Sequence, residues 1–110
     1  MRLDERSVVA RIDRLTLRDL RAWMREGWVL PAQGETGPEF DDLDVARLRL
    51  LCDLRKDMAL PPDVMPTVLT LIDHLNRTRR DLHVLAEALD AQPADVRRAV
   101  VATVRSRMPD

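Results

Sequence analysis

The sequence predicts an all-α-dominated fold in which one very short β-hairpin interrupts a series of helices. Hydrophobic residues make up 45% of the 110-residue chain but aromatic residues only 3%, so the core must use Leu, Val, Met and Ala, which favours helices. Apolar residues recur at intervals of three and four in several stretches. Glycines and prolines gather in residues 27–38, where they predict turns.

The first half of the chain predicts two helices followed by a hairpin. A serine and a threonine can cap helices over residues 7–12 and 16–26. The glycine after the second helix stops it, and residues 28–31 favour a short strand. The turn then runs through residues 33–39, with residues 39–40 as the return strand. A tight polar hairpin after two short helices indicates a winged helix-turn-helix.

The second half predicts three further helices. An aspartate at its start can cap a helix over residues 41–57, and two prolines at 61–62 then force an extended connection. A long helix over residues 63–89 follows, and a proline opens an extra C-terminal helix over residues 93–107.

The long helix needs a partner surface. We expect a winged helix-turn-helix region over residues 1–60 and a long helix plus C-terminal helix over residues 61–110, together one compact domain. The long helix carries a heptad seam interrupted at Thr78, which predicts a homodimer or, alternatively, packing of the last helix on the same seam. The seam consists of Val68, Leu71, Leu75, Leu82, Leu85 and Leu89.

Catalysis, metal binding and cofactor binding are not expected. His74 and His83 are nine residues apart on one helix and therefore face opposite sides. No glycine loop for phosphate is present, and the single cysteine, Cys52, excludes an internal disulfide. The charged N-terminus does not resemble a signal peptide, and no window reaches the roughly 18 apolar residues of a membrane span. We expect a cytoplasmic protein that is not an enzyme.

Charge separates two kinds of partner. Arg18, Arg21 and Arg25 share one face of the second helix, which suits DNA. The chain has a formal net charge of −1, however, whereas a dedicated nucleic-acid binder is usually basic. The hairpin and the helix start behind it lack Lys and Arg and would repel phosphates. Their carboxylates are Glu35, Glu39, Asp41, Asp42 and Asp44.

Two stretches resemble known families. Residues 17–31 and 40–50 look like the second helix, strand and post-wing helix of MerR-type domains, although MerR regulators normally carry an arginine in the wing where this chain has Glu39-Phe40. The fuller match, over roughly residues 7–89, is to the CbpM chaperone-modulator family. It rests on the order of Gly27-Trp28-Val29 with Pro31, Phe40-Asp41-Asp42, Leu54-Arg55 with Met58-Ala59-Leu60, and Val68-Leu69-Thr70-Leu71-Ile72-Asp73.

The resemblance to CbpM implies a function. Members of that family bind the J-domain of a CbpA-type, DnaJ-like co-chaperone and inhibit its action on DnaK. A J-domain contacts DnaK through a basic helix, so the five carboxylates are the expected contacts, with Trp28 as a candidate anchor. The segment after Pro93 extends beyond the family's usual end. The alternative is a MerR-family DNA-binding transcriptional regulator that uses the three arginines.

Overall fold

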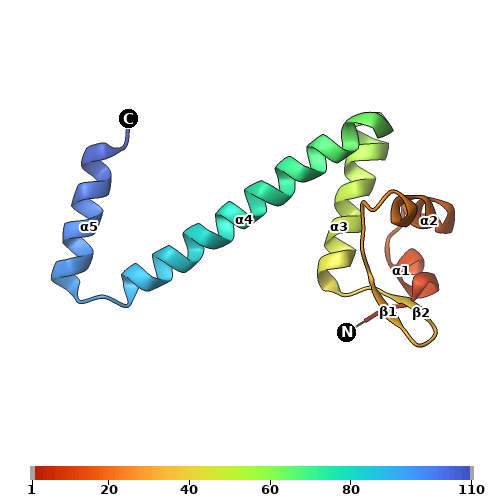
Figure 1. Cartoon of the computed structure of the whole chain (residues 1–110), viewed down its shortest axis with the longest axis horizontal. Coiled ribbons are helices and arrows are strands. Elements are labelled where there is room, and N and C mark those ends of the chain that lie inside the picture. Colours follow the sequence, from red (N-terminus) through yellow and green to blue (C-terminus); the bar gives the residue numbers. More distant parts are fainter. Residues whose placement is uncertain (1, 110) are drawn as a thin grey trace. The chain divides into compact units, whose positions relative to one another are not determined.

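The computed structural model describes residues 2–109, which form five α-helices and one hairpin (Figure 1), as the sequence predicts. Contacts divide the chain into two units, Met1–Leu69 and Thr70–Asp110, and each is described by itself. The boundary expected after residue 60 stays a prediction. The elements are α1 (Glu5–Arg11), α2 (Leu17–Arg25), β1 (Ala32–Gly34), β2 (Gly37–Glu39), α3 (Asp42–Cys52), the π-helix η1 (Asp53–Asp57), the 3₁₀ helix η2 (Pro62–Val64), α4 (Met65–Asp90) and α5 (Ala94–Arg107).

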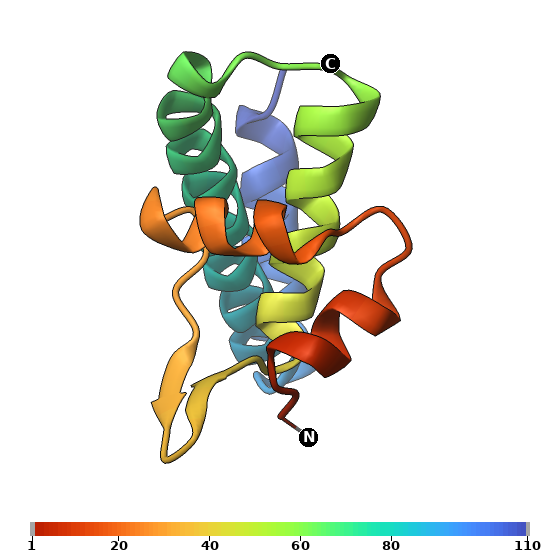
Figure 2. The ribbon, with the colours of Figure 1, turned by 90° about the vertical axis from the view of Figure 1, so that its right-hand side faces the viewer.

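The core of the first unit lies between α1, α2 and α3. Figure 2 shows α2 crossing α3, with α1 beside them. Leu20 of α2, Phe40 ahead of α3 and Leu48 within it are fully buried. Side chains of this size each contribute about 1.5–3 kcal/mol when removed from water, so this core stabilises the whole unit.

Local caps fix where these helices begin and end. Thr16 caps α2 as predicted, because its Oγ1 accepts a hydrogen bond from the Asp19 N–H at 3.1 Å. α1 is capped by Asp4 and not by Ser7, whose N–H instead donates to Asp4 Oδ1 at 2.8 Å. The helix therefore starts two residues before the predicted residue 7. Gly27 ends α2 with φ of +77°, a left-handed conformation that glycine adopts without strain.

The hairpin lies where the turn was predicted, but its first strand starts later than predicted and its second strand starts earlier. Ala32 pairs with Glu39 and Gly34 with Gly37, while residues 28–31 form no strand. The reason is tertiary, since Trp28 and Val29 are buried and act as core residues.

The N-terminal arm is held by the hairpin. Leu3 and Phe40 exchange two backbone hydrogen bonds, Leu3 N–H to Phe40 O at 2.8 Å and Phe40 N–H to Leu3 O at 2.7 Å. This antiparallel bridge fixes the arm beside the end of β2, although the polar sequence of the arm gave no sign of it.

The third helix ends in an irregular joint. Residues 53–57 continue α3 as a π-helix, and Ala59 then has a φ of +54°. The predicted end near residue 57 is correct, but the change of helix type was not predicted. Pro61 and Pro62 make the expected connection, and α4 starts at Met65, two residues after the predicted Asp63.

The second unit has no buried side chain among residues 70–109. α4 is long, as predicted, and Leu71, Leu75, Leu82 and Leu85 are 54–65% exposed. α5 follows Pro93, and its valines Val96, Val100 and Val104 are 41–47% exposed. α5 therefore leaves the heptad seam of this unit uncovered.

Candidate functional site

Two of the five predicted carboxylates are free to meet a partner. Glu35 lies at the tip of the hairpin and Asp42 in the first turn of α3, and both are exposed. Neither makes a hydrogen bond or an ion pair with another residue between positions 2 and 109. We call the hairpin of residues 32–39, the segment just before it and the first turn of α3 the hairpin corner, and these two carboxylates give it accessible negative charge.

Glu39 is held within the chain. Its Oε2 accepts from Arg2 Nη1 at 3.3 Å, in an ion pair whose side chains are partly exposed. The Glu39 side chain also passes over Gly34, because a Cβ added there would lie 2.1 Å from Glu39 Oε1. The arm thus supplies a cation to the hairpin, and Glu39 contributes less net charge than its sequence position suggested.

Asp41 and Asp44 form a capping box at the start of α3. Asp41 Oδ1 accepts from the Asp44 N–H at 2.8 Å, and Asp44 Oδ2 accepts from the Asp41 N–H at 3.0 Å. The backbone N–H of Asp44 lowers the pKa of the Asp41 carboxyl, whereas burial raises the pKa of Asp44. The main role of both residues is therefore to cap the start of α3, and they are less available to a partner than Glu35 and Asp42.

The tryptophans are core residues. Trp28 is 7% exposed and Trp23 is 5% exposed. The carbonyl of Trp28 also accepts from Arg47 Nε at 2.8 Å, which ties the segment before β1 to the second turn of α3. Trp28 therefore has little surface to offer, and its contribution to the site is to position this segment.

Two leucines that flank the hairpin in sequence are largely exposed. Leu30 is 79% exposed and Leu43 is 77% exposed, the highest values among the large hydrophobic side chains that the structure describes. The exposure of Leu43 could have been inferred from the sequence, because Leu43 lies outside the apolar stripe of α3 that starts at Val45. The exposure of Leu30 could not, because residues 28–31 were expected to form a strand.

The three arginines of α2 are unequal. Arg21 Nε donates to Glu5 Oε2 of α1 at 3.1 Å. Arg18 and Arg25 are exposed and have no ion pair within the described part of the chain. They lie seven residues apart on one face of α2, so a basic face of two unpaired guanidinium groups remains.

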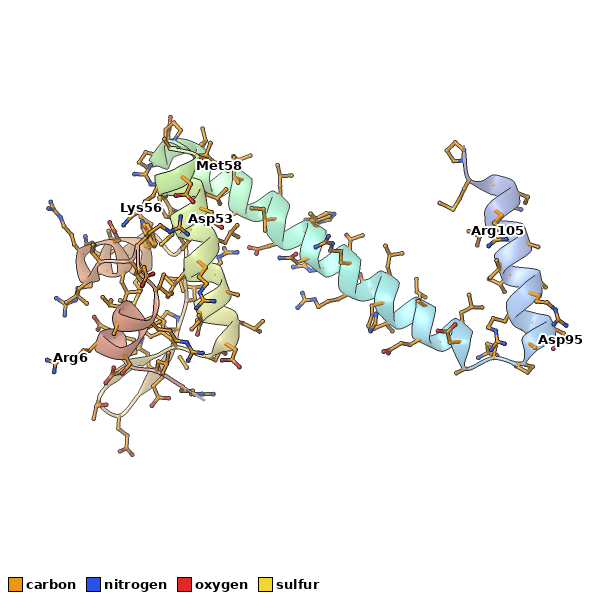
Figure 3. The ribbon with its side chains drawn as sticks, turned by 180° about the vertical axis from the view of Figure 1, so that it is seen from behind. Arg6, Asp53, Lys56, Met58, Asp95 and Arg105 are labelled. Atoms are coloured by element: carbon orange, nitrogen blue, oxygen red, sulfur yellow. The ribbon has the colours of Figure 1, made fainter. Side chains whose placement is uncertain are left out.

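The groove between α1, α2 and the hairpin has balanced charge. It has a volume of about 380 Å³ and is lined by Asp4 and Glu5 as well as by Arg6 and Arg21. Figure 3 shows Arg6 projecting outward from α1. The two carboxylates of the groove are matched by two guanidinium groups, so the groove by itself favours neither an anionic nor a cationic partner.

A set of ion pairs fastens the α1–α2 turn to η1; we call it the Arg14–Lys56 clamp. Arg14 bridges Asp53, at 2.6 Å, and Asp57, while Lys56 Nζ contacts Asp19 Oδ2 at 2.6 Å and also donates to the Arg14 carbonyl. Figure 3 labels Asp53 and Lys56 at this joint. The hydrogen bonds to Asp53 and Asp57 raise the pKa of Arg14.

The described residues contain no group of three His, Cys, Asp or Glu side chains that could hold a metal ion. Cys52 is buried, and burial raises the pKa of its thiol. No helix within positions 2–109 is both long and apolar enough to cross a membrane.

Comparison with known families identifies the helix-turn-helix region. Residues 7–64 match the family described as "MerR HTH family regulatory protein". The match starts within α1 and extends through η2, so it contains both helices of the helix-turn-helix, the hairpin and the joint. Comparisons with curated proteins and with solved structures gave no match.

Proposed function

The chain belongs to the MerR HTH family of regulatory proteins, and from this premise we propose that it is a chaperone modulator. It binds the J-domain of a CbpA-type, DnaJ-like co-chaperone in the cytoplasm and inhibits the action of that co-chaperone on DnaK. The observation that carries the proposal is the hairpin corner. Glu35 and Asp42 are exposed there without partners among the described residues, and residues 29–46 contain no Lys or Arg.

Charge favours a basic protein partner over DNA. A wing that grips DNA supplies cations to the phosphate backbone, whereas this wing supplies carboxylates. In the charge-balanced groove beside α2, Glu5 forms an ion pair with Arg21, so this arginine is less available to a phosphate group. Opposite charges on a J-domain helix would speed association and fix its orientation. The ordered resemblance of residues 7–89 to CbpM supports the same partner.

Isothermal titration calorimetry with a purified J-domain tests the proposal. We expect binding that weakens as salt rises, because exposed charges are screened. The double variant Glu35→Lys with Asp42→Lys should abolish the salt dependence and weaken binding at least tenfold. Glu87→Lys is the control, since the side chain of Glu87 is 68% exposed on α4 and pairs with His83 one turn away. Absence of binding by the wild-type chain at tens of micromolar would refute the proposal.

A second function, DNA-binding transcriptional regulation, is favoured by one observation. Arg18 and Arg25 present unpaired cations on one face of α2, the helix that reads DNA in this layout. Titration of random-sequence duplex DNA at low and moderate salt tests it. An affinity that falls steeply with salt and is lost in Arg18→Ala with Arg25→Ala, but not in Arg77→Ala, would favour the regulator. Such binding together with no J-domain binding would replace the chaperone proposal.

We also propose that the chain forms a homodimer through the seam of α4. The seam leucines from Leu71 to Leu85 are more than half exposed, so a second copy would bury them. Analytical ultracentrifugation should give twice the 12.6 kDa chain mass. A monomeric mass at high micromolar concentration would reject the dimer.

A further inference from the structure

We infer that Leu30 and Leu43 are the apolar anchors of the hairpin corner, and that the partner segment they receive is a basic amphipathic helix with an aliphatic side chain between its cations. This inference rests on the proposed function and specifies its contact surface. It also replaces Trp28, which is 7% exposed, as the source of apolar contact.

The exposure of these two leucines is unusual for their unit. Leu20, Leu48 and Leu51 are fully buried in the same unit, whereas Leu30 and Leu43 are 79% and 77% exposed. The exposed leucines of α4 belong to a regular helical seam, but Leu30 and Leu43 belong to no such stripe. Isolated exposed leucines are common, so Leu30 and Leu43 form a shared apolar surface only if their backbone segments lie near each other.

Backbone register places both leucines at one corner. Ala32 pairs with Glu39, so the residues just before β1 lie across from those just after β2, where α3 begins. Figure 1 shows β2 leading directly into the start of α3. Arg47 Nε binds the Trp28 carbonyl at 2.8 Å and holds α3 against the segment that contains Leu30. Leu43 is one turn before Arg47, on the same face of α3.

The charges around this pair define the partner. Asp42 is adjacent to Leu43 and unpaired among the described residues, and Glu35 extends the negative charge to the hairpin tip. This surface has an apolar centre and a negatively charged rim. It suits a partner surface on which an aliphatic side chain is flanked by Lys or Arg. The apolar contact contributes affinity, and the opposite charges at the rim set the orientation of the partner. A DNA backbone offers neither an aliphatic group nor positive charge.

The test compares apolar and charge variants of the full chain in binding to a purified J-domain. Leu30→Ser with Leu43→Ser should raise Kd at least tenfold and leave the slope of log Kd against log salt unchanged. Glu35→Lys with Asp42→Lys should instead change that slope. Met58→Ser is the matched control, because Met58 is 62% exposed in the same unit and lies at the joint (Figure 3). It should bind like wild type.

Different outcomes would overturn the role of the two leucines and the proposed binding of a J-domain. Wild-type binding with a Kd for the leucine double variant within twofold would overturn the inference and leave the function standing. An equal loss in Met58→Ser would overturn it too, because the effect would not be specific to the corner. No wild-type binding would overturn both. The single variant Leu43→Gln, which suits an exposed helix position, should retain native helicity and still weaken binding several-fold.

Discussion

The two units of the chain are stabilised in different ways. Every buried hydrophobic residue of the described chain lies between Val8 and Leu69, and no residue from 70 to 109 is buried. The first unit therefore has its own core, whereas the second is a pair of helices with exposed apolar stripes. Most of the stability of helices in proteins comes from packing of an apolar face, and the apolar faces of α4 and α5 are largely exposed.

The helix starts show the same difference. Asp4, Thr16 and Asp41 cap α1, α2 and α3 through side-chain hydrogen bonds. α5 starts after Pro93, which makes no such bond. Side-chain caps therefore fix the helix starts of the first unit, whereas α5 of the second unit begins without one.

The largest effect is expected from a core truncation in the first unit. Leu48→Ala removes a fully buried side chain of α3 and should lower the free energy of unfolding by about 2–5 kcal/mol. Leu82→Ala, at a side chain that is 60% exposed, should change it by less than about 0.5 kcal/mol in dilute samples. Urea denaturation at low micromolar concentration measures both. Equal losses would mean that the second unit has a core of its own.

The sequence predicts many of the helix boundaries in both units, because capping residues, glycine and proline act on their near neighbours. The N-caps at Thr16 and Asp41, the stop at Gly27 and the break at Pro61 each act within a few residues, so the sequence alone places α2 and α3. The heptad spacing likewise predicts the long helix. The caps are predictable because their hydrogen bonds close over three or four residues, and the proline break is predictable because it acts on its immediate neighbours.

Contacts between distant residues were not predictable. Arg14 and Asp53 are 39 residues apart, and Leu3 pairs with the distant Phe40. No pattern of neighbouring residues predicts either contact. The first strand starts later than predicted because Trp28 and Val29 are buried in the core, which outweighed the β-propensity of residues 28–31. The five carboxylates of the acidic surface were predicted from the sequence. Which of them are already engaged was not, because Glu39 pairs with the distant Arg2 and the capping box engages two more.

The next largest effect concerns the second unit. Leu75→Glu with Leu82→Glu places charges in the exposed seam and should leave the first unit folded. If a second copy covers this seam, the variant sediments as a monomer and loses helical circular dichroism signal, since unpartnered helices fray. Arg77→Gln with Arg80→Gln, at two exposed positions of the same helix, lowers the net charge by the same two units and is the charge-matched control. A variant with wild-type mass and helicity would show that the seam is not an interface.

A smaller effect is expected at the Arg14–Lys56 clamp. Arg14→Met removes the contacts to Asp53 and Asp57 but leaves the core intact, so the melting temperature should fall less than in Leu48→Ala. Because the clamp is exposed, the difference from wild type should shrink at 1 M salt, where the Debye length is about 3 Å. Arg77→Met in the second unit should not change the melting temperature. A loss that is independent of salt would assign Arg14 a packing role.

The smallest effect is a pH dependence at Asp19, which joins α2 to the clamp. Burial alone would raise the pKa of Asp19, but hydrogen bonds from Lys56 and Thr16 outweigh it, and the pKa lies below its ordinary value. A lowered folded-state pKa means that Asp19 stabilises the fold above its unfolded pKa of about 3.9 and that this stability is lost as pH falls through the folded value. Asp19→Asn should therefore melt at a lower temperature than wild type at pH 6, with the gap closing toward pH 2.

The pH dependence of Asp19 is read from the difference in melting temperature between wild type and Asp19→Asn, because Asp44 also titrates at acid pH. Asp44 has a raised pKa, so its contribution runs in the opposite direction: it is present below the unfolded pKa and is lost as pH rises through the folded value. Wild type and variant share Asp44, so subtracting their melting curves isolates Asp19. A gap that stays constant from pH 6 to pH 2 would mean that the Lys56 contact does not stabilise the ionised carboxylate, and that the clamp is held by Arg14 alone.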